Sequence, residues 1–260
     1  PGERCKIKID HVGRTCAYGS LVRVEKTSEH RVTPECESFG HCGGCVFWHM
    51  DYACELEQKR RRVQDALSRI GGIDFPDLQI TGSESIYGYR NKVQFPVQVQ
   101  NGKAVAGFYK AGSHTVIPIT DCKIQPGVAK TIRAAVLSWM EKENVPAYDE
   151  RTHTGLVRHI YLRYGAKSGQ TLVCTVANCE ALPKKKALVR EILAADANVT
   201  GIVVNYNTKK SNVILGERFE TLYGEGYLED MLLGLTFRLS PAAFYQVNHD
   251  QAERLYEKAI

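Results

Sequence analysis

The stretch ECESFGHCGGCVFWH, residues 35–49, places three cysteines within ten positions. Cys36, Cys42 and Cys45 follow the spacing C-x5-C-x2-C, and two glycines fill the last gap. Three thiolates this close together repel one another unless a cation or a cluster neutralises them. The glycines let the backbone wrap closely and direct N–H groups at sulfur. The spacing therefore fits a zinc ion or an iron–sulfur cluster, and both usually take four protein ligands.

The fourth ligand is not decided by the spacing of these three cysteines. The other candidates are Cys5, Cys16, Cys54, Cys122, Cys174, Cys179, His41 and His49. Cys174 alternates within an apolar strand, where a cysteine behaves as a small buried hydrophobe. Cys122 lies in PITDCKIQP, after an expected strand and before a proline, in a loop from which a thiol can project. Cys122 is one open candidate among several on this reasoning.

Length, charge and cysteine usage bound the class of protein. The 260 residues suffice for one large domain or two to three small ones. A net charge of +5 and a pI near 8.7 permit a polyanionic partner without requiring one. Nine unevenly placed cysteines are unlike the even disulfide framework of a short secreted protein, so we expect a reducing cytoplasm. No apolar run approaches the roughly 20 residues that span a bilayer, so no membrane partner is expected.

Hydrophobic periodicity predicts an α+β fold. Short strands are expected in 1–33, 92–119 with a turn at 101–102, 159–164, 171–177, 201–207 and 212–247, and helices in 50–70, 127–143 and 184–196. Asn248 is a plausible N-cap for a last helix, HDQAERLYEKAI. The chain opens without a methionine and stops inside this helical pattern, so we expect it to be a piece of a longer protein.

Several segments together resemble the bacterial RNA uracil-C5 methyltransferases that modify 23S ribosomal RNA and tRNA. ECESFGHCGGC and ITDCKIQP are similar to the family's iron–sulfur motif, which has three close cysteines and a fourth far downstream. YGYRNKVQF and GFYKAGSHTVIPITDC look like its central domain, and SPAAFYQVN resembles its S-P-x-x-F-x-Q-V-N segment. The opening PGERCKIKI is similar to the second half of a TRAM domain, a small OB-like RNA-binding barrel.

The resemblance implies three parts. Residues 1–33 would complete the TRAM barrel, 34–230 would form a mixed α/β central domain with an iron–sulfur loop, and 231–260 would be the strand-rich start of a Rossmann-like methyltransferase domain. It also implies a 4Fe–4S cluster on Cys36, Cys42, Cys45 and Cys122. The family's catalytic cysteine and base lie beyond the S-P-x-x-F-x-Q-V-N segment, so no catalytic residue is assigned and the 260 residues alone are expected to be inactive.

The cofactor implied by the resemblance is S-adenosylmethionine, and Gln246 matches the family glutamine that contacts it. Phe244 matches an aromatic residue near the substrate base. Basic residues interleaved with aromatic ones suit single-stranded RNA, because bases stack and phosphates pair with cations. The expected RNA-contacting residues are Arg90, Asn91, Lys92, Phe108, Tyr109, Lys110, His114, Arg158 and Phe244.

Ribosomal 23S RNA is expected as partner rather than tRNA, because the bacterial tRNA-specific branch typically lacks this cysteine set. We expect a monomer. The alternative is a non-catalytic, zinc-stabilised RNA-binding module, which iron analysis would distinguish. A radical S-adenosylmethionine enzyme is disfavoured, because its C-x3-C-x2-C spacing differs from the one found here.

Overall fold

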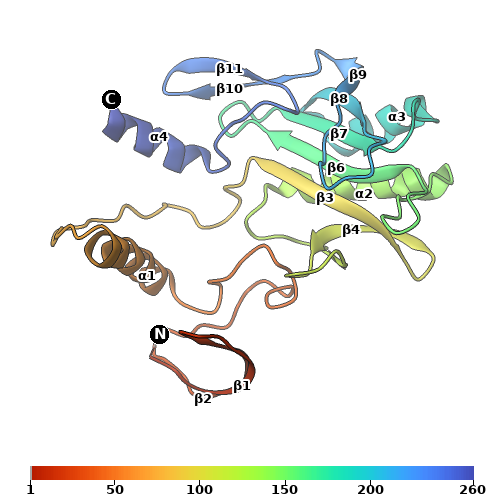
Figure 1. The fold of residues 1–260 in the computed structure, drawn as a ribbon. Helices are drawn as coiled ribbons and strands as arrows, with labels where there is room; N and C mark the ends of the chain where they lie inside the picture. Colours follow the sequence, from red (N-terminus) through yellow and green to blue (C-terminus); the bar gives the residue numbers. More distant parts are fainter. Residues whose placement is uncertain (1) are drawn as a thin grey trace. The chain divides into compact units, whose positions relative to one another are not determined.

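The computed structural model describes residues 2–260, which fall into two compact units (Figure 1). Unit 1 runs to Phe39 and resumes over Cys45–Gly82. Unit 2 consists of Gly40–Gly44 and Ser83–Ile260. In the described part of the chain, no helix combines the length and the apolar character needed to cross a bilayer.

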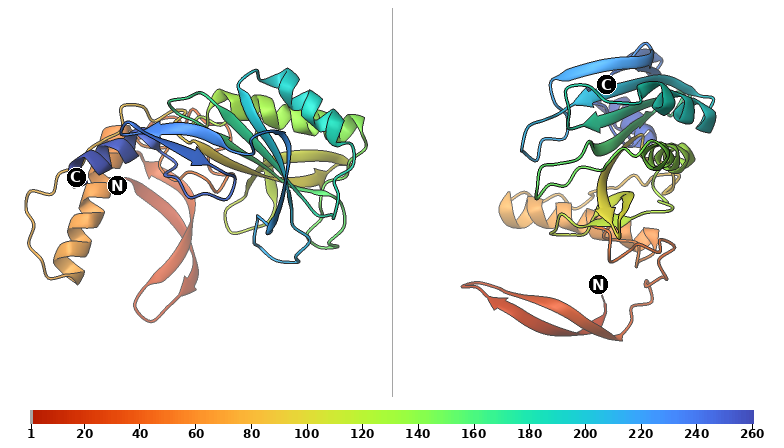
Figure 2. Two further views of the ribbon diagram at one scale, coloured as in Figure 1. Left: turned by 90° about the horizontal axis from the view of Figure 1, so that it is seen from above. Right: turned by 90° about the vertical axis from the view of Figure 1, so that its right-hand side faces the viewer.

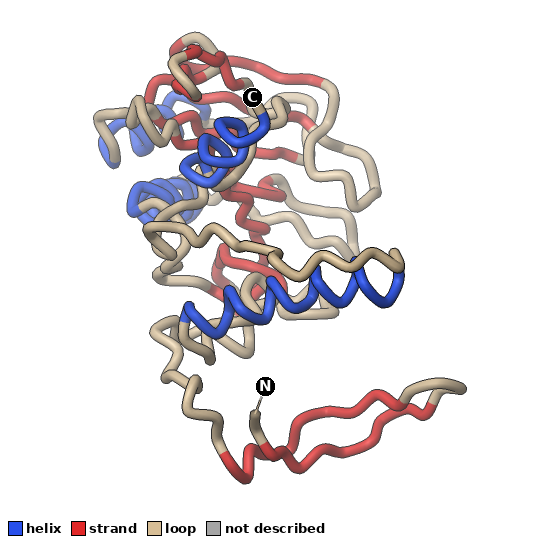
Figure 3. The backbone as a smooth tube through the Cα atoms, turned by 90° about the vertical axis from the view of Figure 1, so that its left-hand side faces the viewer, coloured by secondary structure: helices blue, strands red, loops and turns tan. Residues whose placement is uncertain are grey.

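Unit 1 contains an antiparallel ribbon and one helix (Figure 3). Strands β1 (Arg4–Val12) and β2 (Ala17–Lys26) form a two-stranded antiparallel sheet and are exposed along almost their whole length. The expected strands are therefore confirmed, whereas the TRAM barrel stays a prediction.

The helix of unit 1 is built from local interactions. Helix α1 (Tyr52–Asp65) begins where the Asp51 carboxylate accepts the Cys54 N–H at 2.7 Å. Its basic run is paired within the helix, with Lys59 on Glu55 and two arginines on Glu57. We predicted one helix through residue 70, but the last five residues, Ala66–Ile70, form a π-helical turn.

Unit 2 is organised by a seven-stranded sheet of order β5-β4-β3-β6-β7-β8-β9. The strands are β3 (Lys92–Gln100), β4 (Lys103–Tyr109), β5 (Val116–Pro118), β6 (Val157–Tyr164), β7 (Thr171–Ala177), β8 (Val199–Tyr206) and β9 (Arg218–Gly224). Neighbours pair antiparallel except β7 and β8, which are parallel and joined through helix α3 (Lys185–Ala195). Asn101 and Gly102 have positive φ between β3 and β4, as a tight hairpin turn requires.

Both faces of the sheet are covered (Figure 2). Helices α2 (Gly127–Lys142) and α3 pack side by side on one face, where Trp139 and Ile192 are fully buried. The other face packs against the hairpin of β10 (Leu228–Leu232) and β11 (Leu235–Leu239) and against α4 (His249–Ala259). The predicted mixture of helices and strands is confirmed, including the Asn248 cap, whose side chain accepts the Gln251 N–H at 3.2 Å.

Candidate functional site

The segment 240–248, which links β11 to α4, combines a buried anchor with an exposed aromatic ring. Pro241 and Tyr245 are buried, whereas Phe244 between them is 82% exposed. Gln246 is half-buried. Single exposed apolar side chains are ordinary on protein surfaces, so Phe244 is a candidate contact because of its place on an anchored segment and not because of its exposure alone.

A buried arginine holds the first half of this segment. Arg163, on β6, is 2% exposed, and its Nε and Nη2 atoms both donate to the Pro241 carbonyl at 3.3 Å. Nη2 also donates to the Ala243 carbonyl. Burial lowers the pKa of Arg163, with the Tyr161 ring 5.8 Å away as its aromatic neighbour. Within residues 2–260, no carboxylate forms an ion pair with Arg163, so backbone carbonyls are its hydrogen-bond acceptors.

Asn91 holds the second half of segment 240–248. Its side-chain amide donates to the Gln246 carbonyl at 2.8 Å, and its backbone N–H donates to the Val247 carbonyl at 3.0 Å. Asn91 is 3% exposed. The sequence predicts an RNA contact for Asn91, but its buried side-chain NH2 group donates to the segment instead. Arg90 beside it bridges to Asn248, which fixes the entry into α4.

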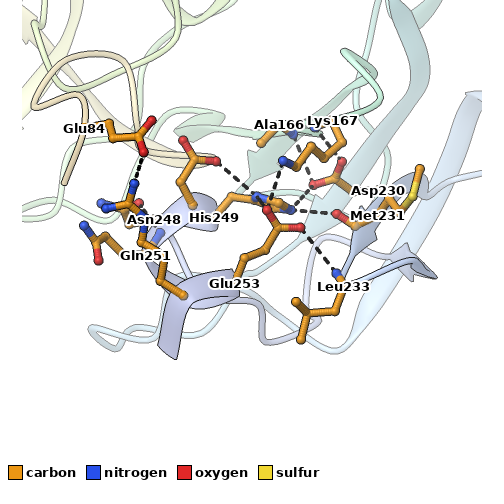
Figure 4. Close-up of polar contacts among 12 residues, drawn as sticks. Glu84, Ala166, Lys167, Asp230, Met231, Leu233, Asn248, His249, Gln251 and Glu253 are labelled. Carbon is orange, nitrogen blue, oxygen red and sulfur yellow. Dashed lines mark hydrogen bonds and ion pairs between the residues drawn. The ribbon is translucent and has the colours of Figure 1, made fainter. Parts of the chain in front are cut away.

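Beneath the segment lies a buried polar network (Figure 4). The Asp230 carboxylate accepts N–H groups from Ala166, Lys167 and Ser168 at 3.1, 2.9 and 3.2 Å. It also accepts the Tyr245 hydroxyl at 3.4 Å, and burial followed by the charge of Asp230 raises the pKa of Tyr245.

The first residue of α4 joins the same network. The His249 Nε2 atom donates to the Met231 carbonyl at 2.6 Å, which ties the helix to β10 (Figure 4). Glu253 on the next turn accepts the Leu233 N–H at 3.3 Å and pairs with Lys167 at 2.9 Å. The backbone of 240–248 is thus restrained from both ends and from below, and Phe244 is presented by a rigid support.

Three basic residues, Arg90, Lys92 and Arg163, are neighbours next to Asn91. Lys92 faces Arg163 across the β3–β6 pair, and the Arg90 Nε atom donates to the Lys92 carbonyl at 3.0 Å. Burial, Arg163 and Arg90, in that order, lower the pKa of Lys92. Like charges opposite each other on neighbouring strands are destabilising, so this region favours an approaching anion.

A second group of predicted RNA residues lies at the end of β4 and the turn after it. The Tyr109 hydroxyl donates to Glu150 at 3.0 Å, and His114 Nδ1 lies 2.8 Å from the same carboxylate. Phe108 packs on Phe95 with ring centroids 5.3 Å apart, so its ring belongs partly to the core. Lys110 is exposed on the turn.

Arg158 differs from the other predicted RNA residues. It is 5% exposed, and its guanidinium donates to the carbonyls of Asn207, Lys209 and Ser211 at 2.8, 2.8 and 3.0 Å. The guanidinium also lies 4.6 Å from the Tyr148 ring. These contacts give Arg158 a structural role inside unit 2, because both of its terminal amino groups donate to backbone carbonyls.

The four predicted cluster cysteines are all half-buried. Cys36 and Cys45 belong to unit 1, whereas Cys42 and Cys122 belong to unit 2. The Gly44 N–H donates to the Cys42 sulfur at 3.4 Å, as expected for a loop that directs amides at a thiolate.

Gly43 shows why glycine is needed between Cys42 and Cys45. Its N–H donates to the Tyr109 carbonyl at 3.0 Å. A Cβ atom at this position would lie 3.1 Å from the backbone of Ala111 and from the Tyr109 carbonyl. The predicted close backbone approach is confirmed, and cluster ligation by the four cysteines stays a prediction.

Sequence patterns missed the residues that position segment 240–248. Arg163 and Asp230 sit inside strands and have no recognisable motif around them. The available signal was a charged residue within a strand of otherwise buried residues. A buried charge needs a dedicated partner, so such a residue is expected to hold another part of the chain in place. Cys174 was correctly placed in the core, and burial raises its thiol pKa to about 12.

No protein-family model matches the chain. An uncharacterized RNA methyltransferase of Bacillus cereus is 38% identical over 261 residues, which is 100% of this chain and 57% of the relative. An uncharacterized RNA methyltransferase of Clostridium tetani is 38% identical over 259 residues, covering 56% of its length.

Among solved structures, the Pyrococcus abyssi tRNA (uracil-54, C5)-methyltransferase in complex with S-adenosyl-L-homocysteine superimposes with a TM-score of 0.75. The match is 23% identical and covers 100% of this chain and 58% of that protein. The chain therefore spans a little more than half the length of the curated relatives it matches, and it shares its fold with the corresponding part of the archaeal structure.

Proposed function

We propose that this chain is the RNA-binding part of an S-adenosylmethionine-dependent RNA uracil-C5 methyltransferase. The observation that carries the proposal is segment 240–248, whose rigid backbone exposes Phe244 two residues from the half-buried Gln246. The names of the relatives and the likeness to the archaeal methyltransferase support it.

The reaction explains what such a segment would do. Uracil C5 is a poor nucleophile, so a cysteine thiolate adds to C6 and makes C5 carbanion-like. C5 then takes the methyl group that S-adenosylmethionine supplies. A base removes the C5 proton, and the thiolate leaves C6, which restores the C5–C6 double bond. The target base must leave its stack to be reached. Phe244 would stack on an unstacked base, and the Gln246 amide would donate to and accept from the cofactor.

The nucleophile and base are proposed to lie outside residues 1–260. Cys174 is unsuitable because it is fully buried and burial raises its pKa to about 12. Transfer of labelled methyl groups to RNA by the 260-residue chain alone would contradict this assignment.

The RNA surface would use exposed or half-exposed groups from unit 2. They are Phe244, Arg90, Lys92, Tyr109, Lys110 and His114. Ribosomal 23S RNA remains the proposed substrate on the resemblance of the cysteine motif. The solved neighbour is named for tRNA, which makes tRNA the second candidate substrate.

The activity is tested with the longer protein that contains this chain. Labelled methyl transfer to 23S RNA and to tRNA transcripts is measured, and 5-methyluridine is identified by mass spectrometry after digestion. Loss of one base stack costs about 1–3 kcal/mol, so we expect F244A to weaken RNA binding roughly 5- to 150-fold. The matched control is F219A on β9, which should bind RNA like the wild type. Equal binding by F244A would contradict the stacking role.

We also propose that Cys36, Cys42, Cys45 and Cys122 hold a 4Fe–4S cluster. The Gly44 N–H directed at the Cys42 sulfur and the close backbone approach at Gly43 support a metal-binding loop. Such a cluster would tie distant parts of the chain together and stabilise the fold.

Anaerobic purification with iron, sulfide and zinc analysis tests the cluster. The wild type should be brown, with about four irons per chain, as a 4Fe–4S centre requires. C122S should lose this iron, whereas C16S, which changes an exposed cysteine, should retain it. Colourless wild-type protein with stoichiometric zinc would favour the zinc-stabilised alternative.

A further inference from the structure

Three side chains of the kinds that bind metal ions lie together at the start of α4 (Figure 4). His249, Asp250 and Glu253 each offer one ligand atom, and these three atoms lie within 4.8 Å of one another. His249 and Glu253 are four residues apart, a spacing that places both side chains on one face of a helix. The group belongs entirely to unit 2.

The two carboxylates alone would carry little meaning. Acidic residues are favourable in the first turn of a helix because of its dipole, and Asp250 fits that explanation. The helix dipole does not account for the imidazole directed at them. His249 is 2% exposed, and its Nδ1 atom faces both Asp250 and Glu253.

One nitrogen of the His249 ring is already used, and this fixes the role of the other. Nε2 lies 2.6 Å from the Met231 carbonyl oxygen, which can only accept, so Nε2 carries a proton. In the neutral ring, Nδ1 is then an acceptor, and ionised carboxylates have no proton to give it. Histidines that bind metals are oriented in the same way, with the distal N–H on a carbonyl or a carboxylate.

The distances decide between a proton and a metal ion at Nδ1. Nδ1 lies 3.4 Å from Asp250 Oδ1 and 3.8 Å from Glu253 Oε2. A protonated Nδ1 would draw a carboxylate to about 2.7–2.9 Å. Ligand atoms that are about 2.0–2.2 Å from a tetrahedral zinc ion lie about 3.3–3.6 Å from one another. The observed spacing is longer than a charge-assisted hydrogen bond and close to that of atoms sharing one cation.

Lys167 is the cation nearest to these groups in the structure. Its Nζ atom lies 2.9 Å from Oε2 of Glu253, the same oxygen that faces His249. The Lys167 side chain is 46% exposed, so it can turn into solvent when another cation arrives. Lys167 and a metal ion would therefore compete for Glu253.

We propose that His249 Nδ1, Asp250 and Glu253 bind a divalent transition-metal ion, with water at the remaining positions. One imidazole nitrogen and two carboxylate oxygens suit Mn²⁺, Fe²⁺ or Zn²⁺, whereas Mg²⁺ prefers oxygen ligands. The ion would hold the first residues of α4 in one arrangement, while Nε2 keeps the ring against β10. The inference does not depend on the proposed RNA methylation.

Mn²⁺ alone is the probe, because thiolates select softer metals and the nine cysteines would take up zinc. Loss of the electron paramagnetic resonance signal of free Mn²⁺ measures binding to the whole chain. We expect the wild type to bind a single Mn²⁺, and Mg²⁺ in about tenfold excess should leave it bound, because imidazole favours the transition metal.

Three variants locate the ion. D250N should weaken Mn²⁺ binding at least about tenfold, since even the outer partners of metal ligands are worth that much. E257Q is the matched control, because it removes an exposed carboxylate from the same helix, and it should bind like the wild type. K167M should tighten binding about 2- to 5-fold, because an exposed lysine–carboxylate pair is worth little.

The thermal midpoint gives a second readout. Asp250 has a 71% exposed side chain, so D250N should fold, and without metal its midpoint should be close to that of the wild type. Mn²⁺ should raise the midpoint of the wild type and of E257Q but not of D250N, because an ion that binds only the folded state stabilises it.

The proposal is overturned if the wild type binds no Mn²⁺, or if D250N and E257Q lose affinity equally. Displacement of Mn²⁺ by an equal concentration of Mg²⁺ would show that only carboxylates hold the ion, and His249 would not be a ligand.

Discussion

Replacing Arg163 with lysine tests whether this buried residue positions the segment that exposes Phe244. The guanidinium serves the Pro241 and Ala243 carbonyls together. A lysine keeps the charge but cannot present a fork of donors, so one of these carbonyls would lose its partner. A hydrogen bond to a charged group contributes about 1.5–3 kcal/mol. We therefore expect R163K to lose about 2 kcal/mol, which is roughly a 30-fold change in an opening equilibrium.

Amide hydrogen exchange of peptides covering 240–248 is the assay, together with urea unfolding of the whole protein. R158K is the matched control, because Arg158 is also buried and also bonds backbone carbonyls, but those of Asn207, Lys209 and Ser211. We expect exchange in 240–248 to accelerate in R163K alone, and exchange around 207–211 to accelerate in R158K alone. The same exchange of 240–248 in R163K and the wild type would refute the positioning role.

Three further outcomes follow from burial and charge. Burial, and then the charge of Arg158, lowers the pKa of His159 from 6.5 to about 4. The unfolded chain therefore binds a proton more readily than the folded protein. The free energy of unfolding that this difference contributes above pH 6.5 is lost as the pH falls towards 4. In H159Q, the fall in the free energy of unfolding between pH 7 and pH 4, measured by urea unfolding, should be smaller by about 3 kcal/mol than in the wild type. The same pH dependence in both proteins would contradict this role of His159. N248A removes the cap of α4 and should cost about 1 kcal/mol in the same assay, and no change would show that the cap is dispensable. Iodoacetamide should modify the exposed Cys16 quickly and the buried Cys174 hardly at all in native protein, as read by mass spectrometry; comparable labelling would show that β7 opens readily.

The element types could be predicted where the hydrophobic period was long and turn residues marked the ends. The hairpin at Asn101 and Gly102 and the cap at Asn248 are examples, because their backbone geometry depends on the local residues. The π-helical turn over Ala66–Ile70 was missed, because its residues have the same helical spacing as the preceding turns.

The candidate site was predicted only in part. A motif singles out Phe244 and Gln246, and the structure shows buried residues that hold the backbone around them. Their contacts with a base and a cofactor stay predictions. The interleaving of basic and aromatic residues predicts RNA contacts for Asn91 and Arg158, because the sequence pattern is the same whether a side chain faces solvent or the interior. Burial, which needs the packed sheet, assigns both to internal hydrogen bonds.

The sequence by itself determined the local features: the cysteine spacing with its glycines, and the strand and helix periods. Each depends on residues a few positions apart. Only the tertiary structure decided how Arg163 reaches Ala243, 80 positions away, and how Asn91 reaches Gln246, 155 positions away. The physical reason is that a buried polar group must be paired, and the identity of its partner is set by which strands and loops the folded sheet brings together.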